Sequence, residues 1–295
     1  MKLEQILIVP KLTKFEWDMY RLKLTEQELR NFYDKQGVRT SKILDSHKKQ
    51  KAGFERLVNM LKGAHIANRD DLTKDLAMKY SLIIAFGGDN HFQYVSHFVD
   101  GTPILGINSD PERSEGALTS LSSDTLENYI PLIISDGFEM EEWARLKASI
   151  DGKGINELSV SEIFIGEEKR YNISRHIITK DGKSEEQKGS GLLIVTGAGS
   201  TGWYDSACRY LFSEGNKFPK NLSEARYILT EPYNGKLSSL TSIHGSIKEG
   251  EEIEVTSLSD DKAFLSVDCL HFFPLREGAK VKIKLDTPLR VVRLK

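Results

Sequence analysis

The chain has 295 residues, enough for one or two domains with a full hydrophobic core, and its 28% charged and 39% hydrophobic residues are typical of a globular protein. Its net charge of −2 creates no field that would attract nucleic acid, and its two cysteines, Cys208 and Cys269, lack the Cys-x-x-Cys spacing of a zinc site. No run of about 18 apolar residues could cross a membrane, and the first residues resemble neither a secretion signal nor an import leader, so we expect a cytoplasmic protein without a membrane partner.

Short apolar runs alternate with helical patterns in the first third of the chain. Buried strands are predicted at residues 4–11, 81–86 and 102–108. Between the first two strands, Thr25 and Glu28 match a capping box at the start of a helix that Gly37 ends, and a second helical pattern runs from Phe54 to Gly63. Strands that alternate with helices predict a Rossmann-like α/β domain, in which helices cover both faces of a parallel sheet.

The pattern changes after about residue 150. The segments there are short, rich in β-branched residues and often alternating, with turn signals such as Asp181-Gly182 between them. This half therefore predicts a mostly antiparallel β domain. We place an α/β domain at residues 1–115 and a β-rich domain at residues 116–295, with a last strand able to pack back on the first domain.

The apolar run at residues 81–86 leads directly into Gly87-Gly88-Asp89. The carboxyl edge of a parallel sheet is where open α/β folds bind ligands, and glycines let phosphate oxygens approach backbone N–H groups. Asp89 could then hold Mg²⁺ or accept a proton from an attacking hydroxyl. The alternative interpretation is a tight turn capped by an aspartate.

A second glycine-rich segment, residues 197–202, matches the spacing Gly-x-Gly-x-x-Gly after a strand. A dinucleotide-binding fingerprint also needs an acidic residue about 20 positions further on, at the end of another strand. Glu224 has no preceding strand, and no Gly-Lys-Ser/Thr follows, so we reject both the Rossmann fingerprint and the P-loop. The segment remains a turn that can present Thr196, Ser200 and Thr201 to a polar ligand, or an ordinary β-turn beside which Trp203 packs.

Two such turns, about 110 residues apart on an α/β half and a β half, resemble the NAD kinase family. The family pattern is Gly-Gly-Asp-Gly-Thr, then an Asn-Glu pair, then Thr-x-Thr-Gly-Ser-Thr-Ala-Tyr. Three stretches are similar to its mitochondrial-type branch: KLTKFEWDMYR, GINSDPERSEG and SGLLIVTGAGSTGW. The resemblance covers nearly the whole chain, and it implies that residues 1–115 form the ATP-side domain and residues 116–295 the NAD-binding domain. It implies a kinase that transfers the γ-phosphate of ATP to the adenosine-ribose 2′-hydroxyl of NAD, with Mg²⁺ supplied with ATP, and it implies a homodimer or larger homo-oligomer.

The resemblance also implies roles for individual residues. Asp89 corresponds to the catalytic aspartate. The residues expected to bind NAD are Gly88, Asn90, Ser161, Glu162, Thr196, Ser200, Thr201 and Trp203. Those expected at the phosphates of ATP are Gly87, Gly88, His91, Asn108, Arg113, Lys11 and Lys14. No residue is expected to form a dedicated metal site, and the three cationic residues in this set could instead be solvated.

The chain departs from the family pattern at the centre of the site. Asn90 replaces the last glycine of the motif, His91 replaces its threonine, and Ser161 replaces the asparagine of the Asn-Glu pair. If the glycine needs a left-handed backbone, asparagine is the side chain best able to adopt it. His91 could replace the threonine when neutral, add charge near phosphates when protonated, or simply pack over the turn. We expect slow phosphoryl transfer or an unusual phosphoryl donor. Removing oriented hydrogen-bond donors at a reacting centre reduces rates on the order of a hundredfold.

Two other function classes remain open. A catalytically impaired protein could hold NAD or NADP as a sensor without transferring phosphate. Lipid kinases share the Gly-Gly-Asp-Gly-Thr start and the two-domain plan, but the chain has no apolar segment suited to a membrane surface and the Asp-Pro-Glu-Arg-Ser-Glu-Gly stretch is foreign to them. The lipid kinase is therefore the weakest alternative.

Overall fold

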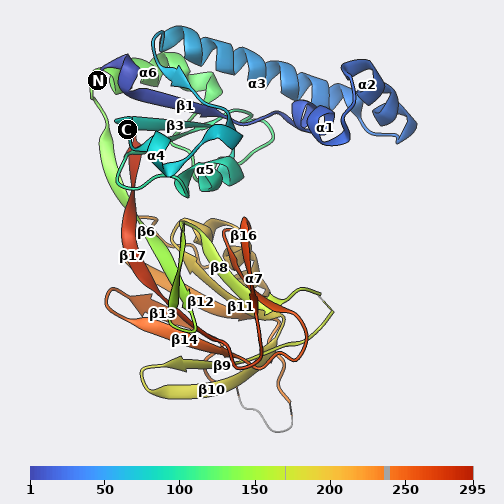
Figure 1. Cartoon of the computed structure of the whole chain (residues 1–295), viewed down its shortest axis with the longest axis vertical. Coiled ribbons are helices and arrows are strands. Elements are labelled where there is room, and N and C mark those ends of the chain that lie inside the picture. The colour runs from blue at the N-terminus through green and yellow to red at the C-terminus, as the bar shows by residue number, and fades with distance from the viewer. Residues whose placement is uncertain (170, 236–239, 295) are drawn as a thin grey trace. The chain divides into compact units, whose positions relative to one another are not determined.

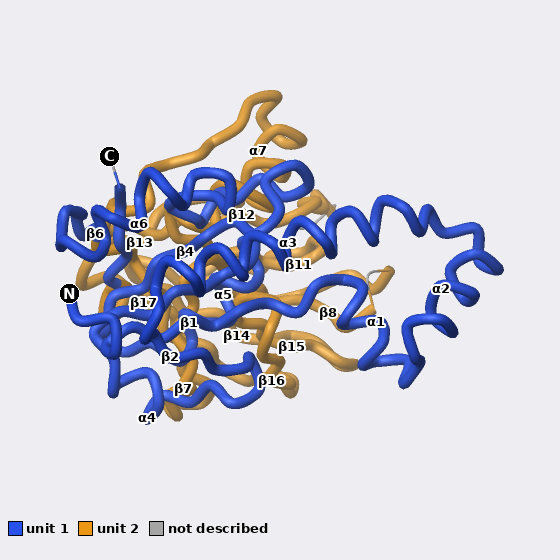
Figure 2. Tube along the Cα trace, turned by 90° about the horizontal axis from the view of Figure 1, so that it is seen from above, with its two compact units in different colours: residues 1–141, 290–295 blue, residues 142–289 orange. Residues whose placement is uncertain are grey.

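A computed structural model describes residues 1–169, 171–235 and 240–294. The chain forms two compact units: unit 1 contains residues 1–141 and 290–295, and unit 2 contains residues 142–289 (Figure 2). The units divide after residue 141, whereas the sequence-based boundary lies after residue 115, and the nucleotide-binding roles assigned to the two halves stay predictions.

A parallel sheet forms the centre of unit 1. Its strands are β1 (Ile6–Pro10), β2 (His65–Ile66), β3 (Leu82–Gly87), β4 (Ile104–Asn108) and β5 (Leu121–Ser122). They lie in the order β2-β1-β3-β4 with β5 also beside β4, and every pair is parallel. The end of β17 (Lys280–Arg293) pairs with β4 through Val291. The three strands predicted from the sequence are confirmed as β1, β3 and β4, and the parallel α/β fold class is confirmed with them.

Helices cover the sheet of unit 1 and extend beyond it. They are α1 (Lys14–Leu22), α2 (Glu26–Lys35), α3 (Thr40–Met60), α4 (Lys74–Ala77), α5 (Asp89–Ser96) and α6 (Leu126–Ile134), with 3-10 turns η1 (Leu3–Gln5), η2 (Arg69–Asp71) and η3 (Ser123–Thr125). The predicted capping box of Thr25 and Glu28 is confirmed at the start of α2. Helix α3 begins at Thr40, well before the helical pattern predicted from Phe54. Figure 1 shows α1, α2 and the first half of α3 projecting away from the sheet.

Hydrophobic clusters join the helices of unit 1 to its sheet and to one another. One cluster packs Leu57 of α3, Leu61 directly after this helix and Ile130 of α6 against the central strands, whose residues are almost fully buried. Another cluster joins α1, α2 and the start of α3 around Phe15, Leu29 and Tyr33. Strands that are buried on both faces have continuous apolar sequences. The strands β3 and β4 are of this kind, which explains why they are recognisable from the sequence.

Unit 2 consists of two packed β-sheets. One has the order β13-β12-β11-β8-β15-β16, and the other contains β10-β9-β14-β17 with β6 and β7 beside it. The bounds are β6 (Glu139–Ile150), β7 (Lys153–Ser159), β8 (Glu162–Glu167), β9 (Ser174–Lys180), β10 (Lys183–Gly189), β11 (Gly191–Thr196), β12 (Glu224–Thr230), β13 (His244–Lys248), β14 (Glu252–Ser257), β15 (Ala263–Val267) and β16 (His271–Leu275), with η4 (Gly199–Thr201) and α7 (Trp203–Phe212) between β11 and β12. The antiparallel β prediction for this half is confirmed.

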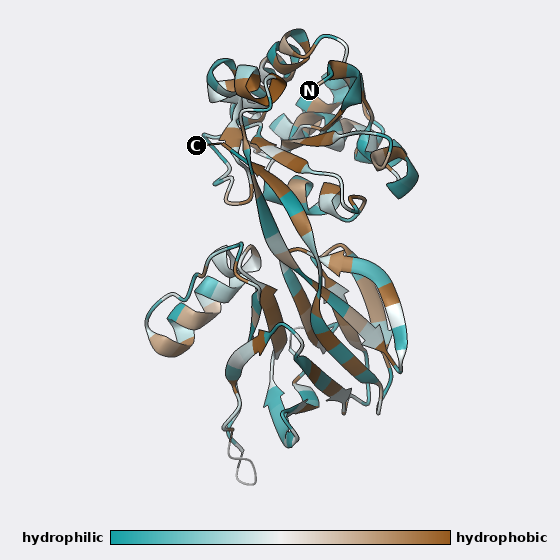
Figure 3. Ribbon diagram, turned by 90° about the vertical axis from the view of Figure 1, so that its left-hand side faces the viewer, coloured by the Kyte–Doolittle hydropathy of each residue, from teal (hydrophilic) through white to brown (hydrophobic). Residues whose placement is uncertain are grey.

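The core of unit 2 lies between the two sheets. It contains Ile163 and Ile165 of β8, Leu265 of β15, and Ile253 and Val255 of β14. Buried and more exposed residues alternate along β14, and the strands of this unit are banded with both hydropathy colours in Figure 3. Helix α7 covers the opposite face of β11. In the described part of the chain, no helix combines the length and apolarity that crossing a bilayer requires.

Candidate functional site

The glycine turn of unit 1 follows β3 directly. Gly87 is the last residue of β3, Gly88 is the N-cap of α5, and Asp89 is the first residue of that helix. A Cβ atom on Gly87 would lie 2.7 Å from the His91 ring, and one on Gly88 would lie 2.9 Å from Ser114 Oγ. Both glycines therefore give neighbouring side chains room to pack, and this requirement for glycine was not recognised from the sequence.

The carboxylate of Asp89 is held by the loop that follows β4. Its two oxygens accept hydrogen bonds from the backbone N–H groups of Ala117, at 3.1 Å, and Leu118, at 2.7 Å. The side chain stays partly exposed at the N-terminus of α5. The two hydrogen bonds fix the direction of the carboxylate, so the chain presents an oriented carboxyl group next to the glycine turn.

Asn90 and His91, the two departures from the family motif, occupy different environments. Asn90 is exposed within helix α5 and is not among the non-glycine residues with positive φ, so the left-handed backbone considered from the sequence does not occur. The imidazole of His91 is 1% exposed, and its Nε2 lies 2.8 Å from the backbone oxygen of Val9. His91 thus packs against Gly87, as one of the sequence-based alternatives expected.

Burial also sets the charge of His91. Desolvation lowers the pKa of the imidazole to about 4, with smaller contributions from the positive charges of Arg69 and Lys11, and only the hydrogen bond to Val9 acts in the opposite direction. At neutral pH the ring is therefore uncharged, with a hydrogen on Nε2 that is donated to Val9. This state disfavours the alternative in which a protonated His91 adds charge near phosphates.

The other residues expected near phosphates differ in whether their polar groups already form hydrogen bonds or ion pairs within the protein. Asn108 Nδ2 donates to the backbone oxygen of Ser114 at 2.9 Å, and its Oδ1 accepts from the N–H of Asp110 at 3.1 Å, so this side chain holds the loop after β4. Arg113 Nη1 lies 3.4 Å from Asp110 Oδ1, and Lys14 forms an ion pair with Asp18. Lys11 forms no ion pair with any residue in the described part of the chain.

In unit 2 the predicted turn at residues 196–201 packs directly on residues 159–162, which connect β7 to β8 and include Ser161 and Glu162. Thr196, at the end of β11, donates from Oγ1 to the backbone oxygen of Val160 at 2.5 Å and from its N–H to that of Ser161 at 2.9 Å. A Cβ atom on Gly199 would lie 2.2 Å from the Ser161 backbone oxygen. The glycine therefore allows the turn at residues 196–201 to approach the turn at residues 159–162.

The hydroxyl groups of the 196–201 turn stabilise the turn itself. Ser200 is fully buried, and its Oγ donates to the backbone oxygen of Gly197 at 2.8 Å and accepts from the N–H of Phe218 at 3.1 Å. Thr201 Oγ1 donates to the backbone oxygen of Ala198 at 3.1 Å. These contacts fix the conformation of the turn, and direct contact of its residues with NAD stays a prediction.

Asp268, which the sequence analysis did not identify, holds the 159–162 turn. Its carboxylate accepts from Ser159 Oγ at 2.6 Å and from the backbone N–H groups of Val160, Ser161 and Glu162 at 2.9–3.0 Å. The residue is 2% exposed and has a φ of 49°. Its only sequence signal is its place directly after the strand-like run AFLSV, which carries no motif.

Glu162 lies beside this carboxylate. Burial raises the pKa of the Glu162 side chain to about 7, and the negative charge of Asp268 acts in the same direction. Cys269 Sγ lies 3.7 Å from Glu162 Oε1. Trp203 is 41% exposed at the start of α7, and its ring centroid lies 4.9 Å from that of Phe164. Unit 2 therefore presents a partly buried carboxyl group that changes charge near neutral pH.

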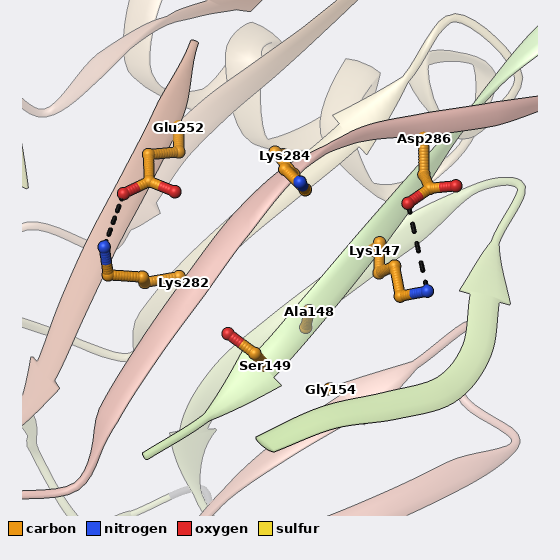
Figure 4. A pocket seen from close by; sticks show the side chains of 8 residues that line it. All are labelled: Lys147, Ala148, Ser149, Gly154, Glu252, Lys282, Lys284 and Asp286. Carbon is orange, nitrogen blue, oxygen red and sulfur yellow. Dashed lines mark hydrogen bonds and ion pairs between the residues drawn. The ribbon is translucent and has the colours of Figure 1, made fainter. Parts of the chain in front are cut away.

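A hollow elsewhere in unit 2 contains none of the predicted site residues. It is lined by Lys147, Ala148, Ser149, Gly154, Glu252, Lys282, Lys284 and Asp286, from β6, β7, β14 and β17 (Figure 4). Most of its charges are paired: Lys282 lies 2.6 Å from Glu252, and Lys147 lies 3.9 Å from Asp286. Such exposed pairs are typical of a solvated surface, so we assign this hollow no role.

Comparisons with known proteins give consistent relatives, although no protein-family profile matches the chain. A probable NADH kinase of Oryza sativa subsp. japonica is 24% identical over 235 residues, which cover 72% of this chain and 70% of the rice protein. The protein "NAD kinase 2, mitochondrial" of Homo sapiens is 25% identical over 252 residues, which cover 68% of this chain and 57% of the human protein. The chain thus spans little more than half the length of this human relative.

Solved structures with the same fold are also NAD or NADH kinases. The crystal structure of an NAD kinase from Archaeoglobus fulgidus in complex with ATP matches with a TM-score of 0.67 at 18% identity, covering 98% of this chain and 93% of the other. The structure of yeast NADH kinase complexed with NADH matches with a TM-score of 0.63 at 15% identity, covering 80% and 68%. In sequence the chain is therefore similar to NAD and NADH kinases, and its fold is similar to that of solved members of this group.

Proposed function

We propose that the chain is an NAD(H) kinase, a phosphotransferase that uses an alcohol group as acceptor. It transfers the γ-phosphoryl group of ATP, or of another phosphoryl donor, to the adenosine-ribose 2′-hydroxyl of NAD. The observation that carries the proposal is the carboxylate of Asp89, which two backbone N–H groups orient directly after the Gly87-Gly88 turn. This turn lies at the carboxyl edge of a parallel sheet, where open α/β folds bind their ligands.

Phosphoryl transfer to a hydroxyl group requires mainly an oriented base and correctly bound phosphates. The 2′-oxygen of NAD attacks the γ-phosphorus, the bond from that phosphorus to the bridging oxygen breaks, and ADP leaves. The hydroxyl proton passes to Asp89, and the products are NADP and ADP. Phosphoryl transfer depends mainly on positioning and on neutralising charge, and the contacts to Ala117 and Leu118 supply the positioning of the base.

Mg²⁺ fits this scheme as an ion bound mainly by the phosphates of ATP. Among the described residues, no group of three or more His, Cys, Asp or Glu side chains lies close enough together to hold a metal ion. Mg²⁺ commonly uses one or two carboxylates together with phosphates and water, and Asp89 is the partly exposed carboxylate at the glycine turn. The ion would neutralise phosphate charge during transfer.

Unit 2 contains most of the proposed NAD-binding residues, whereas Gly88 and Asn90 belong to unit 1. Ser161, Glu162, Thr196, Ser200 and Thr201 lie on two turns that hydrogen bonds and close glycine packing join. The carboxyl group of Glu162 can accept hydrogen bonds from ribose hydroxyls when ionised. Trp203 offers a partly exposed aromatic ring beside these turns. The relatives' names and the NADH complex of the yeast enzyme support a pyridine nucleotide as the ligand.

One observation favours a second candidate function, a sensor that binds NAD or NADP without transferring phosphate. The side chain of Asn90 stands exposed beside Asp89, where the family pattern has glycine. Such a side chain can obstruct a phosphate or a ribose at the turn. None of the relatives described above is a lipid kinase, and that alternative gains no support.

A coupled assay for NADP tests the proposal. Purified protein with Mg²⁺ should convert NAD to NADP with ATP or polyphosphate as donor, at a rate well below that of a typical kinase, which is about 1–100 s⁻¹. NAD binding by calorimetry without NADP formation from either donor would select the sensor instead. The same assay with NADH decides which redox form is preferred.

A homo-oligomeric state and a cytoplasmic location stay predictions, although several relatives are named as mitochondrial.

A further inference from the structure

Three neighbouring parallel strands of unit 1 bring Arg69, Lys11 and Gly87 to the same edge of the sheet. Ile66 of β2 pairs with Ile8 of β1, and Ile8 pairs with Ile84 of β3. Arg69, Lys11 and Gly87 each lie three residues beyond these partners. The N–H of Lys11 still bonds to the backbone oxygen of Phe86 at 2.9 Å, so the chain leaves β1 beside the glycine turn.

The side chain of Arg69 is held against the helix that follows the glycine turn. Its guanidinium carbon lies 3.7 Å from the centroid of the Tyr94 ring, and the Tyr94 hydroxyl donates to the Arg69 backbone oxygen at 3.2 Å. Tyr94 belongs to α5, which begins at Asp89. Stacking on an aromatic ring orients an arginine while leaving its N–H groups available to a planar or tetrahedral anion.

Neither cation is neutralised by an acidic side chain within ion-pair distance, as far as the described residues show. Lys14 and Arg113, by contrast, are paired with Asp18 and Asp110. Partial desolvation lowers the pKa of Lys11, the charge of Arg69 lowers it further, and the charge of Asp110 opposes this effect. Two like charges held together without an acid partner destabilise the free protein, and a bound anion relieves their repulsion.

We propose that Lys11 and Arg69 form a subsite for a phosphate group of the phosphoryl donor, next to the Gly87-Gly88 turn. The subsite deepens the proposed kinase function and rests on it for the identity of the ligand. A phosphate oxyanion matches both side chains, because Arg binds it in a bidentate fashion and Lys acts as a point charge. The phosphate belongs either to a nucleoside triphosphate or to inorganic polyphosphate, and the experiment below separates these sources.

Calorimetric titration tests the subsite without requiring turnover. ATP, inorganic tripolyphosphate and uncharged adenosine are titrated into the parent protein and into the variants Arg69→Gln and Lys11→Gln. Each substitution should weaken binding of ATP, of tripolyphosphate or of both by about tenfold or more, because each removes a hydrogen bond to a charged group. Adenosine affinity should stay within twofold. A loss confined to ATP would identify a nucleotide donor, and a loss confined to tripolyphosphate would identify a polyphosphate donor.

Matched controls separate a ligand role from a structural one. Arg30→Gln removes another unit 1 arginine that lies over an aromatic ring, 5.7 Å from the Phe15 centroid, and Lys62→Gln removes an exposed lysine. Both should bind the phosphates like the parent. If Arg69→Gln fails to fold, Arg69→Lys keeps the charge and should retain most of the binding, and Lys11→Gln still tests the subsite.

A second readout follows from His91, whose pKa the charge of Arg69 depresses. The His91 pKa measured by NMR should rise in folded Arg69→Gln. Unchanged affinity for both phosphates in both variants would overturn the subsite. Loss of phosphate binding in a protein that makes no NADP would leave the subsite standing and would refute only the kinase activity.

Discussion

The backbone N–H of Glu162 donates to the carboxylate of Asp268 at 2.9 Å, while the charge of that carboxylate, added to the effect of burial, raises the pKa of the Glu162 side chain. One buried aspartate thus both fixes the turn that carries Glu162 and adjusts its protonation. With a pKa of about 7, Glu162 is mostly neutral at pH 6 and mostly ionised at pH 8. The proposed NAD contact of this side chain should therefore depend on pH in the physiological range.

We expect the KM for NAD to fall as the pH rises from 6 to 8, because the ionised carboxylate is the stronger acceptor for ribose hydroxyls. Steady-state kinetics across this range measures the effect.

The variant Asp268→Asn should raise the KM for NAD at least tenfold and move the transition to lower pH, because it misplaces the turn and removes the neighbouring charge. Asp260→Asn, which changes an exposed acid of the same unit, is the control. A pH-independent KM in the parent would contradict this role of Glu162.

The buried His91 predicts a loss of stability in acid. Its pKa is about 4 in the folded protein, below the ordinary value of 6.5, so the unfolded chain binds more protons between these pH values. The stabilisation is fully present above pH 6.5 and is lost as the pH falls to 4. Chemical denaturation at several pH values should show a decrease on the order of 2–3 kcal/mol from this residue.

The variant His91→Gln should have a flatter pH dependence over this window. The exposed His244→Gln should keep the slope of the parent. An identical slope in His91→Gln and the parent would show that the imidazole does not stay neutral and buried in solution. His176 has a similarly low pKa of about 4 and contributes its own share in every variant.

Asn90→Gly should increase turnover. Asn90 is exposed beside Asp89, and the substitution removes the side chain that can obstruct the ligand. Because Asn90 lies in a right-handed helix, the change to glycine should also destabilise the protein by a few tenths of a kcal/mol, up to about 1 kcal/mol. Turnover and thermal unfolding of the same preparation test both effects, and a slower or unchanged enzyme would place the rate limit elsewhere.

The additional change His91→Thr would recreate the family turn, but its structural consequence differs. It empties the space that the imidazole fills and leaves the backbone oxygen of Val9 without its donor. We therefore expect this variant to lose stability by about 2–4 kcal/mol. Asn90→Gly alone is the cleaner test of the glycine turn.

The sequence predicts those parts of the fold and site that depend on local pattern. The apolar runs of β1, β3 and β4 and the capping box of α2 each lie within about ten residues, and all were found. The first half of α3 was missed because Thr40–Gln50 is mostly polar and has few core contacts. The Gly-Gly-Asp turn was found because it follows one of these runs directly.

Long-range contacts could not be predicted in the same way. Arg69 lies near Lys11 only because β2 pairs with β1 across more than 50 residues of intervening chain. Asp268 reaches the 159–162 turn from more than 100 residues away, and neither residue belongs to a recognisable motif. The requirement for glycine at position 87 likewise depends on where the His91 ring packs, which no local pattern specifies.

The central claim is that Asp89 acts as the base of a phosphoryl transfer to NAD. Single-turnover formation of NADP from NAD and the better donor tests it most directly, in the parent, in Asp89→Asn and in the exposed control Asp100→Asn. Asp89→Asn should reduce the rate by at least a hundredfold, since it removes a positioned base, while NAD affinity stays within a few-fold and Asp100→Asn matches the parent. An Asp89→Asn protein that forms NADP as fast as the parent would contradict the account.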